Sequence, residues 1–168
     1  MTPYIIMIVS LLLDGLLSNY LPYLANNLSI FTPLLTVISV FIIFPFYRKD
    51  TKKYLITVFI LGFIYDMLYT NLLFFNAVLF FILAFINMKI QKRVTANPFS
   101  LCIESIIMIV VYESLTGILL FTFNMVPISF YKVYYKIIRS LLLNIIYTEL
   151  LYFIVKSLPK KYKEISIN

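Results

Sequence analysis

Six long hydrophobic runs, separated by short polar stretches, make up most of the chain. The runs lack the alternation of apolar and polar residues that marks a membrane β-barrel strand, so they predict helices. Some of them are shorter than the ~20 residues of a perpendicular membrane span, so tilted or partly re-entrant helices are expected. Pro33 and Pro45 are expected to kink or end the second helix. The six predicted segments cover about residues 3–21, 28–46, 54–70, 72–88, 99–123 and 137–158.

Composition places this helical pattern in a membrane. Hydrophobic residues make up 62% of the 168 positions and charged residues 12%, whereas a soluble domain carries about 25% charged residues. No polar stretch is long enough for a separate soluble domain. The sequence therefore predicts one all-α domain over residues 1–168, a polytopic membrane helix bundle of about six transmembrane helices.

Basic residues are distributed unevenly between the two ends of this predicted bundle. Because cytoplasmic loops of membrane proteins are enriched in lysine and arginine, the richer end is expected to face the cytoplasm together with both termini. The net charge of +7 is thus read as a topology signal and a means of contacting lipid headgroups, and no nucleic-acid partner is expected. The richer end holds Arg48, Lys49, Lys52, Lys53, Lys89, Lys92, Arg93, Lys156, Lys160, Lys161 and Lys163, and the other end holds Lys132, Lys136 and Arg139.

Three acids lie within the apolar runs, each toward the outer end of an odd-numbered segment: Asp14, Asp66 and Glu113. An aspartate near the middle of a membrane helix costs about 2.5–3.5 kcal/mol on insertion scales, so such residues usually face a partner or the bundle interior. Asp14–Asn19 and Asp66–Asn71 share the pattern Asp-x-Leu-x-Ser/Thr-Asn, which favours a weak internal repeat of three helical hairpins.

Two interpretations of these acids are open. In the first, they form a buried polar cluster around Arg139, with Asp66 as its favoured partner, that binds a ligand or locks the helices together. In the second, each acid pairs separately and Arg139 reaches the outer headgroups. Glu149, with Glu104, lies nearer the cytoplasmic end, where two carboxylates would tend to share a proton. The candidate buried polar or partner-binding residues are Asp14, Gly62, Asp66, Asn71, Asn76, Glu113, Arg139, Asn144 and Glu149.

An aromatic and basic segment over residues 127–136 precedes the last apolar run. Such a segment suits an outer interfacial helix, a cap over the bundle, or a docking site for an extracytoplasmic partner. Its candidate interface residues are Phe130, Tyr131, Tyr134 and Tyr135.

Signatures of enzymes are missing from the sequence. Histidine is absent, and Cys102 is the single cysteine. The sequence contains no HExxH, GxSxG, Walker loop or CxxC motif. A dyad of Asp14 and Asp66 is conceivable, but its flanking residues match no catalytic motif. We therefore expect a non-enzymatic protein without catalytic, cofactor-binding or metal-ligating residues.

The stretch with Gly62, Phe63, Asp66, Asn71 and Asn76 resembles MreD, the rod shape-determining membrane protein family. The layout resembles that family over the whole chain, including the helix with Pro33 and a last helix of the form Arg139-x-x-x-x-Asn144. Around Asp66 the chain is poor in glycine: Ile64, Met67 and Leu72 fill positions where small residues would allow closer helix approach.

The resemblance implies a bundle similar to the substrate-binding subunit of energy-coupling-factor transporters. It also implies a role in bacterial cell-wall elongation at the plasma membrane, with an MreC-like single-span protein as the direct partner. MreB, a RodA-type glycosyltransferase and a class B penicillin-binding protein would belong to the same complex.

The competing interpretation is a substrate-binding subunit of a small-molecule, vitamin-type transporter. Such subunits usually carry an Ala-x-x-x-Ala motif in the first helix, and the first segment here has no alanine. A polar outer pocket built from Asp14, Asp66 and Arg139 would suit a transporter. Co-purification with a pair of ATPases would favour this alternative.

Overall fold

The computed structural model describes residues 2–24, 32–70, 72–91, 97–123 and 130–157. All regular structure in these residues is helical, which confirms the predicted all-α membrane bundle. The expectation of a single domain over the whole chain stays a prediction. The elements are α1 (Thr2–Leu24), α2 (Leu35–Ile42), the 3-10 helix η1 (Phe44–Tyr47), α3 (Thr51–Tyr69), α4 (Phe75–Gln91), α5 (Pro98–Thr122) and α6 (Phe130–Ser157).

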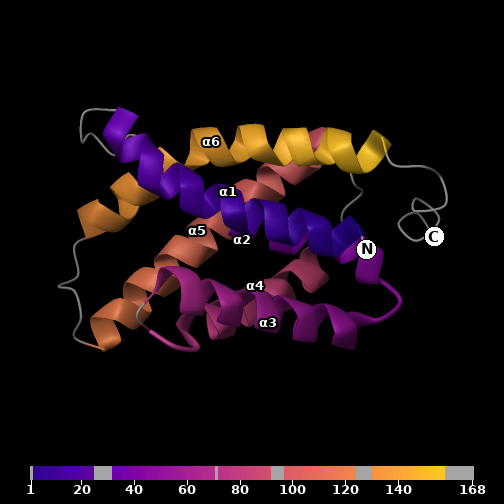
Figure 1. Ribbon diagram of the computed structural model, residues 1–168, viewed down its shortest axis with the longest axis horizontal. Helices are drawn as coiled ribbons and strands as arrows, with labels where there is room; N and C mark the ends of the chain where they lie inside the picture. Colours follow the sequence, from indigo (N-terminus) through magenta and orange to yellow (C-terminus); the bar gives the residue numbers. More distant parts are fainter. Residues whose placement is uncertain (1, 25–31, 71, 92–96, 124–129, 158–168) are drawn as a thin grey trace.

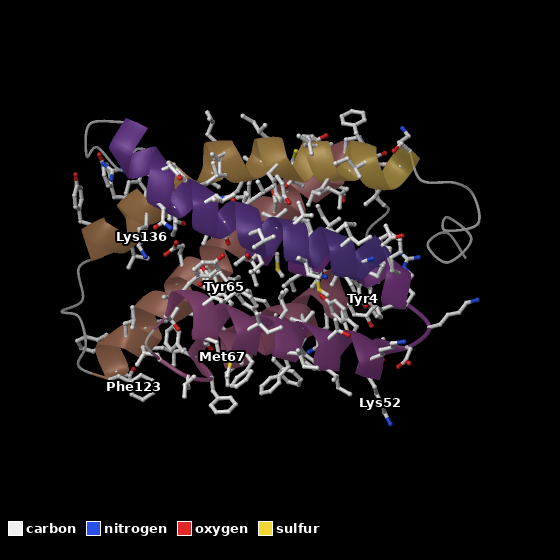
Figure 2. All side chains as sticks on the ribbon, viewed as in Figure 1. Tyr4, Lys52, Tyr65, Met67, Phe123 and Lys136 are labelled. Carbon is white, nitrogen blue, oxygen red and sulfur yellow. The ribbon has the colours of Figure 1, made fainter. Side chains whose placement is uncertain are left out.

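The helices are arranged around α2. The α3–α4 hairpin lies on one side of the bundle, α1 and α6 lie on the other, and α5 crosses between them (Figure 1). The beginning of α1 and the end of α6 lie at the same end of the molecule (Figure 1). Tyr4 and Lys52 lie toward this end, whereas Phe123 and Lys136 lie toward the opposite one (Figure 2).

The second predicted segment differs most from its expected form. Instead of one helix over 28–46, α2 has eight residues, which span about 12 Å against the ~30 Å of a bilayer core. Pro33 lies just before α2, and Pro45 lies in the first turn of η1. Proline disfavours a helical residue before it and breaks an α-helix that it interrupts. The two prolines thus bracket a half-helix.

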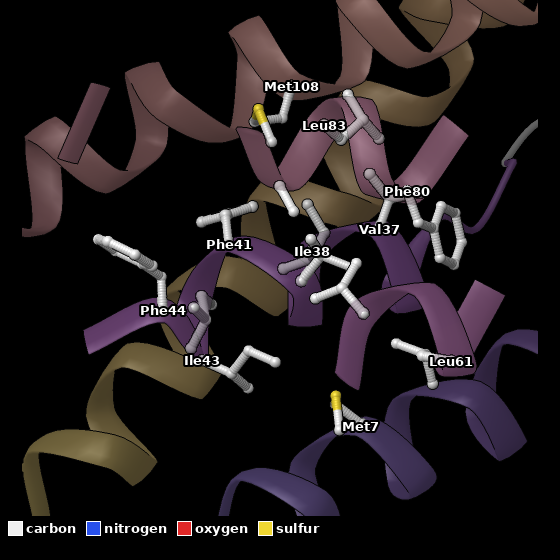
Figure 3. Packing of buried hydrophobic residues seen from close by; sticks show 14 of the residues in the cluster. Met7, Val37, Ile38, Phe41, Ile43, Phe44, Leu61, Phe80, Leu83 and Met108 are labelled. Carbon is white, nitrogen blue, oxygen red and sulfur yellow. The ribbon is translucent and has the colours of Figure 1, made fainter. Parts of the chain in front are cut away.

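All eight residues of α2 are buried, and its apolar side chains form the centre of the core. Val37, Ile38 and Phe41 contact a shell that the surrounding helices supply (Figure 3). The apolar run that predicts a membrane-spanning helix therefore contains an internal core helix. The shell around it includes Met7, Leu61, Phe80, Leu83 and Met108.

The outer surface of the bundle is apolar. Within the described residues, three helical stretches are long and apolar enough to cross a membrane, namely Thr2–Tyr20, Pro98–Thr122 and Val133–Ser157. The helix α4 is apolar but shorter, and α3 carries Lys52, Lys53 and Asp66. Exposed large side chains such as Ile8, Leu12, Ile60, Phe81, Ile107, Leu142 and Ile146 face outward from five helices, as expected of surfaces in contact with lipid.

Candidate functional site

Asp66 on α3 is completely buried and caps the N-terminus of α4. Its two carboxylate oxygens accept hydrogen bonds from the backbone N–H of Asn76 at 3.0 and 2.8 Å and from that of Ala77 at 3.1 Å. The Asn76 side-chain amide donates at 2.8 Å and the Thr70 hydroxyl at 2.9 Å. The first N–H groups of a helix lack partners within it and carry a partial positive charge, so a carboxylate is the matching acceptor.

Gly62, one turn before Asp66, allows the two helices to approach. A Cβ atom at Gly62 would lie 2.6 Å from the Ala77 Cα and 2.7 Å from the Asn76 carbonyl oxygen. The turn before α4 contains Phe74 with a φ of 66°, a left-handed conformation that is uncommon outside glycine. Gly62 thus brings Asp66 within hydrogen-bonding distance of α4.

The larger residues around Asp66 do not separate this hairpin. Ile64 and Met67 are 42% and 62% exposed and point away from α4. Leu72 lies in the turn and is partly exposed. Close helix approach therefore needs a small residue at position 62 and not at these three positions.

Asp14 on α1 caps α2 in the same way. Its carboxylate accepts hydrogen bonds from the backbone N–H groups of Leu35 at 3.2 Å and Thr36 at 3.1 Å. Asp14 is 2% exposed. The start of the buried half-helix thus receives its acceptor from a neighbouring helix.

Asn144 on α6 completes this cap from the other side. Its Oδ1 accepts from the backbone N–H of Leu34 at 2.9 Å, and its Nδ2 donates to the carbonyl oxygens of Thr32 at 3.1 Å and Ser140 at 2.6 Å. Asn144 is completely buried. Asp14 and Asn144 together hold the start of α2 between α1 and α6.

Glu113 on α5 contacts α6. Its carboxylate lies 3.6 Å from the Lys136 ammonium, and the two side chains are 3% and 57% exposed. The guanidinium of Arg139 lies over the ring of Tyr135, 3.8 Å from its centroid. The contacts of Asp66 come from the α3–α4 hairpin, so they give no support to the predicted pairing of Asp66 with Arg139.

Tyrosine hydroxyls add hydrogen bonds between the helices that carry these acids and their neighbours. The Tyr112 hydroxyl on α5 donates to Asn76 Oδ1 at 2.8 Å, and the Tyr69 hydroxyl on α3 donates to the Leu11 carbonyl at 2.9 Å. The phenol of Tyr65 lies within electrostatic range of Asp14, Asp66 and Glu113. The sequence analysis missed these tyrosines because nothing distinguishes them among the 14 in the chain.

The acids follow one rule that agrees with the internal repeat expected from the sequence. Asp14 on α1 contacts α2, Asp66 on α3 contacts α4, and Glu113 on α5 contacts α6. Each odd-numbered helix therefore uses its acid to hold the even-numbered helix that follows it. Asn71, the remaining polar candidate of this region, lies outside the described residues.

Residues 130–136 of the aromatic segment form the first turns of α6. Tyr131, Tyr134 and Tyr135 are 72%, 62% and 43% exposed, and the rings of Tyr131 and Tyr135 stack with centroids 5.9 Å apart. Phe130 begins the helix, and its side chain lies outside the described residues. These tyrosines thus form an outward-facing aromatic surface.

At the other end of the bundle, Glu149 accepts a hydrogen bond at 2.9 Å from the Cys102 thiol. This contact joins the first turns of α5 to the C-terminal part of α6. Within the described part of the chain, no group of three or more histidine, cysteine, aspartate or glutamate residues could hold a metal ion.

Comparison with known proteins gives one match. The family model of rod shape-determining protein MreD matches residues 1–162, nearly the whole chain. No curated protein and no solved structure matches, so the expected likeness to energy-coupling-factor subunits stays a prediction. The chain belongs to the MreD family of rod shape-determining proteins, and it is an integral membrane protein of the cell's shape-determining system.

Proposed function

We propose that this protein is a non-enzymatic scaffold of the cell-wall elongation complex in a bacterial plasma membrane. It binds an MreC-like single-span partner and thereby supports peptidoglycan synthesis and cell-shape control. MreB, a RodA-type glycosyltransferase and a class B penicillin-binding protein act in the same assembly. The observation that carries the proposal is the outward-facing aromatic start of α6 in a member of the MreD family.

The buried acids support a structural role over a catalytic one. Asp14 and Asp66 direct their carboxylate oxygens at backbone N–H groups of the next helix, and Glu113 contacts Lys136. A carboxylate whose oxygens accept hydrogen bonds from the start of a helix is poorly placed to exchange protons with a substrate. The polar groups of the outer half thus hold the bundle together, and its surfaces remain for partners.

The partner is proposed to lie along α6. The exposed apolar side chains of α6 recur every three or four residues and form one stripe along this helix. The stripe begins at the stacked tyrosines. A single membrane helix fits such a stripe because helices in lipid associate through packing and not through the hydrophobic effect. Amphipathic tyrosines suit the membrane–water interface at its outer end. The stripe comprises Tyr131, Tyr135, Ile138, Leu142, Ile146, Leu150 and Phe153.

Affinity purification from native membranes tests the proposal. The protein is expected to recover an MreC-like partner, and depletion of the protein is expected to round or swell rod-shaped cells. Replacing Tyr131, Tyr134 and Tyr135 with serine should lower partner recovery by about tenfold or more, because aromatic anchors contribute most at interfaces. Mass spectrometry of the purified complex and immunoblotting of the protein level give the readouts.

Tyr20→Ser is the matched control, because Tyr20 is 62% exposed on α1 and its loss should leave recovery unchanged. If the triple variant recovered as much partner as the wild-type protein, the proposed binding surface would be wrong. The proposed scaffold role would not be affected. Recovery of a pair of ATPases without an MreC-like protein, together with normal shape on depletion, would establish the transporter alternative instead.

We also propose six membrane segments, the second of them containing the buried half-helix α2, with both termini in the cytoplasm. The beginning of α1, Lys52 and the end of α6 lie at one end of the bundle (Figures 1 and 2), in agreement with the distribution of basic residues. In a Cys102→Ser background, single cysteines at Lys52, Asn26 and Lys161 test this arrangement, the last two positions lying outside the described residues. The cysteine at position 26 alone should react with an impermeant thiol reagent in intact cells, and reaction at position 52 would overturn the topology.

A further inference from the structure

Buried polar side chains surround the C-terminal end of α2, far from the acids that cap its start. The Val40 carbonyl accepts from the Tyr54 hydroxyl at 2.9 Å. The Phe41 carbonyl accepts from the Gln91 amide at 3.0 Å and from the Asn87 amide at 3.4 Å. The last carbonyls of a helix lack partners within it, and lipid offers none, so these side chains satisfy them.

These hydrogen bonds fix the orientation of the Asn87 amide. Its Nδ2 points at the Phe41 carbonyl and at the Tyr54 hydroxyl, 3.1 Å away. A flipped amide would set its oxygen against the Phe41 carbonyl, so the hydrogen-bond network defines which atom is which. Asn87 Oδ1 is consequently directed away from α2, and it is buried without a hydrogen-bond partner.

Glu104 on α5 contributes a second oxygen of the same kind. Its side chain is 3% exposed, and its Oε1 is buried without a hydrogen-bond partner. Gln91 lies beside the Glu104 carboxyl group, and Tyr54 lies within electrostatic range of it. The cluster therefore contains two acceptor oxygens without a donor, next to the negative end of the α2 dipole.

We propose that the unpartnered oxygens of Asn87 and Glu104, beside Gln91 and the C-terminal end of α2, bind one small monovalent cation. Within the described residues no ion pair compensates the Glu104 carboxylate, and a buried carboxylate in that state is costly. A cation bound at this cluster would give the Glu104 and Asn87 oxygens a partner. In broken membrane helices, sites for sodium ions or protons also lie at the C-terminal end of a half-helix. The site contains a single carboxylate, so a singly charged cation neutralises it and a divalent one does not.

Within the described residues, other charged groups at this end of the bundle have contacts of their own. Glu149 on α6 accepts from Cys102, and exposed Lys89 on α4 lies over the ring of Phe85. Tyr54 on α3 donates its hydroxyl proton to the Val40 carbonyl. The cation is either a proton carried by Glu104 or a sodium ion. Either one would bind to the same acceptor oxygens.

Two measurements on the purified full-length protein in lipid nanodiscs test the site. For sodium, replacing choline chloride by sodium chloride at constant ionic strength should raise the thermal unfolding midpoint by about 5–10 °C at a hundredfold excess over the dissociation constant. For a proton, the infrared spectrum at neutral pH should contain the carbonyl band of a protonated carboxylic acid. Glu104→Gln should abolish whichever signal the wild-type protein gives.

Glu149→Gln is the control and should keep that signal. The absence of both signals from the wild-type protein is decisive even if Glu104→Gln fails to fold, whereas a carboxylic acid band is assigned to Glu104 by its loss in that variant. A wild-type protein with neither sodium-dependent stability nor a protonated carboxylic acid would overturn the proposal. A signal that survives in folded Glu104→Gln would overturn it as well.

Discussion

Replacing Asp66 with leucine is expected to leave membrane insertion intact or improved and yet to cost roughly 3–5 kcal/mol of folding free energy. Leucine is far easier to insert than aspartate. In the folded bundle, however, the backbone N–H groups of Asn76 and Ala77 lose their acceptor. A buried donor left unpaired costs about 1–3 kcal/mol. We therefore expect normal amounts of membrane-inserted protein, lowered stability and loss of shape control in depleted cells.

Asp66→Asn separates hydrogen bonding from charge. Asparagine keeps one acceptor oxygen and is a good residue at a helix start, so this variant should lose about half as much stability as Asp66→Leu. Asp50→Leu is the matched control. Asp50 is exposed and caps α3 through the Lys53 N–H at 3.0 Å, and removal of such a cap typically costs about 1 kcal/mol.

Reversible unfolding in mixed micelles measures these stabilities, and cell shape after complementation of a depleted strain measures function. Normal shape and stability in Asp66→Leu would show that the carboxylate is incidental. A fall in membrane-inserted protein would instead place the effect at insertion.

The sequence identified Asp14 and Asp66 as costly acids that need partners, but it did not identify the partners. We expected Arg139, a side chain of opposite charge, as the favoured partner of Asp66. The structure supplies backbone N–H groups at the start of the next helix. Every residue except proline carries such a group, so no residue type at positions 76 and 77 marks them as donors. The start of α4 comes within hydrogen-bonding distance of Asp66 only once the hairpin has formed.

The second segment was misjudged in length for a different physical reason. A helix in lipid and a helix buried in protein both need apolar side chains, so composition alone does not distinguish them. Pro33 and Pro45 marked the ends of the half-helix. The eight residues of α2 are apolar or small hydroxyl residues. Their burial by the neighbouring helices depends on the whole bundle and is not visible in the local sequence. The core of the fold was thus the part least accessible from local sequence.

Replacing Gly62 with alanine is expected to destabilise the protein by about 1–3 kcal/mol, although alanine is the better helix former by about 1 kcal/mol. The added Cβ would meet backbone atoms of Asn76 and Ala77 at 2.6–2.8 Å, and backbone cannot move aside as a flexible side chain can. The α3 and α4 helices would have to separate, and Asp66 would then lose its hydrogen bonds to α4.

Gly117→Ala is the matched control. Gly117 also lies within a helix, but its added Cβ would meet a single methyl group of Val133 at 3.1 Å. A shift of a few tenths of an ångström relieves that contact, so this variant should be close to neutral. Combining Gly62→Ala with Asp66→Asn tests the proposed link between them. If Gly62 acts by bringing Asp66 to α4, the double variant should lose less stability than the sum of the two single losses. Simple additivity would mean that close approach and helix capping stabilise the hairpin independently.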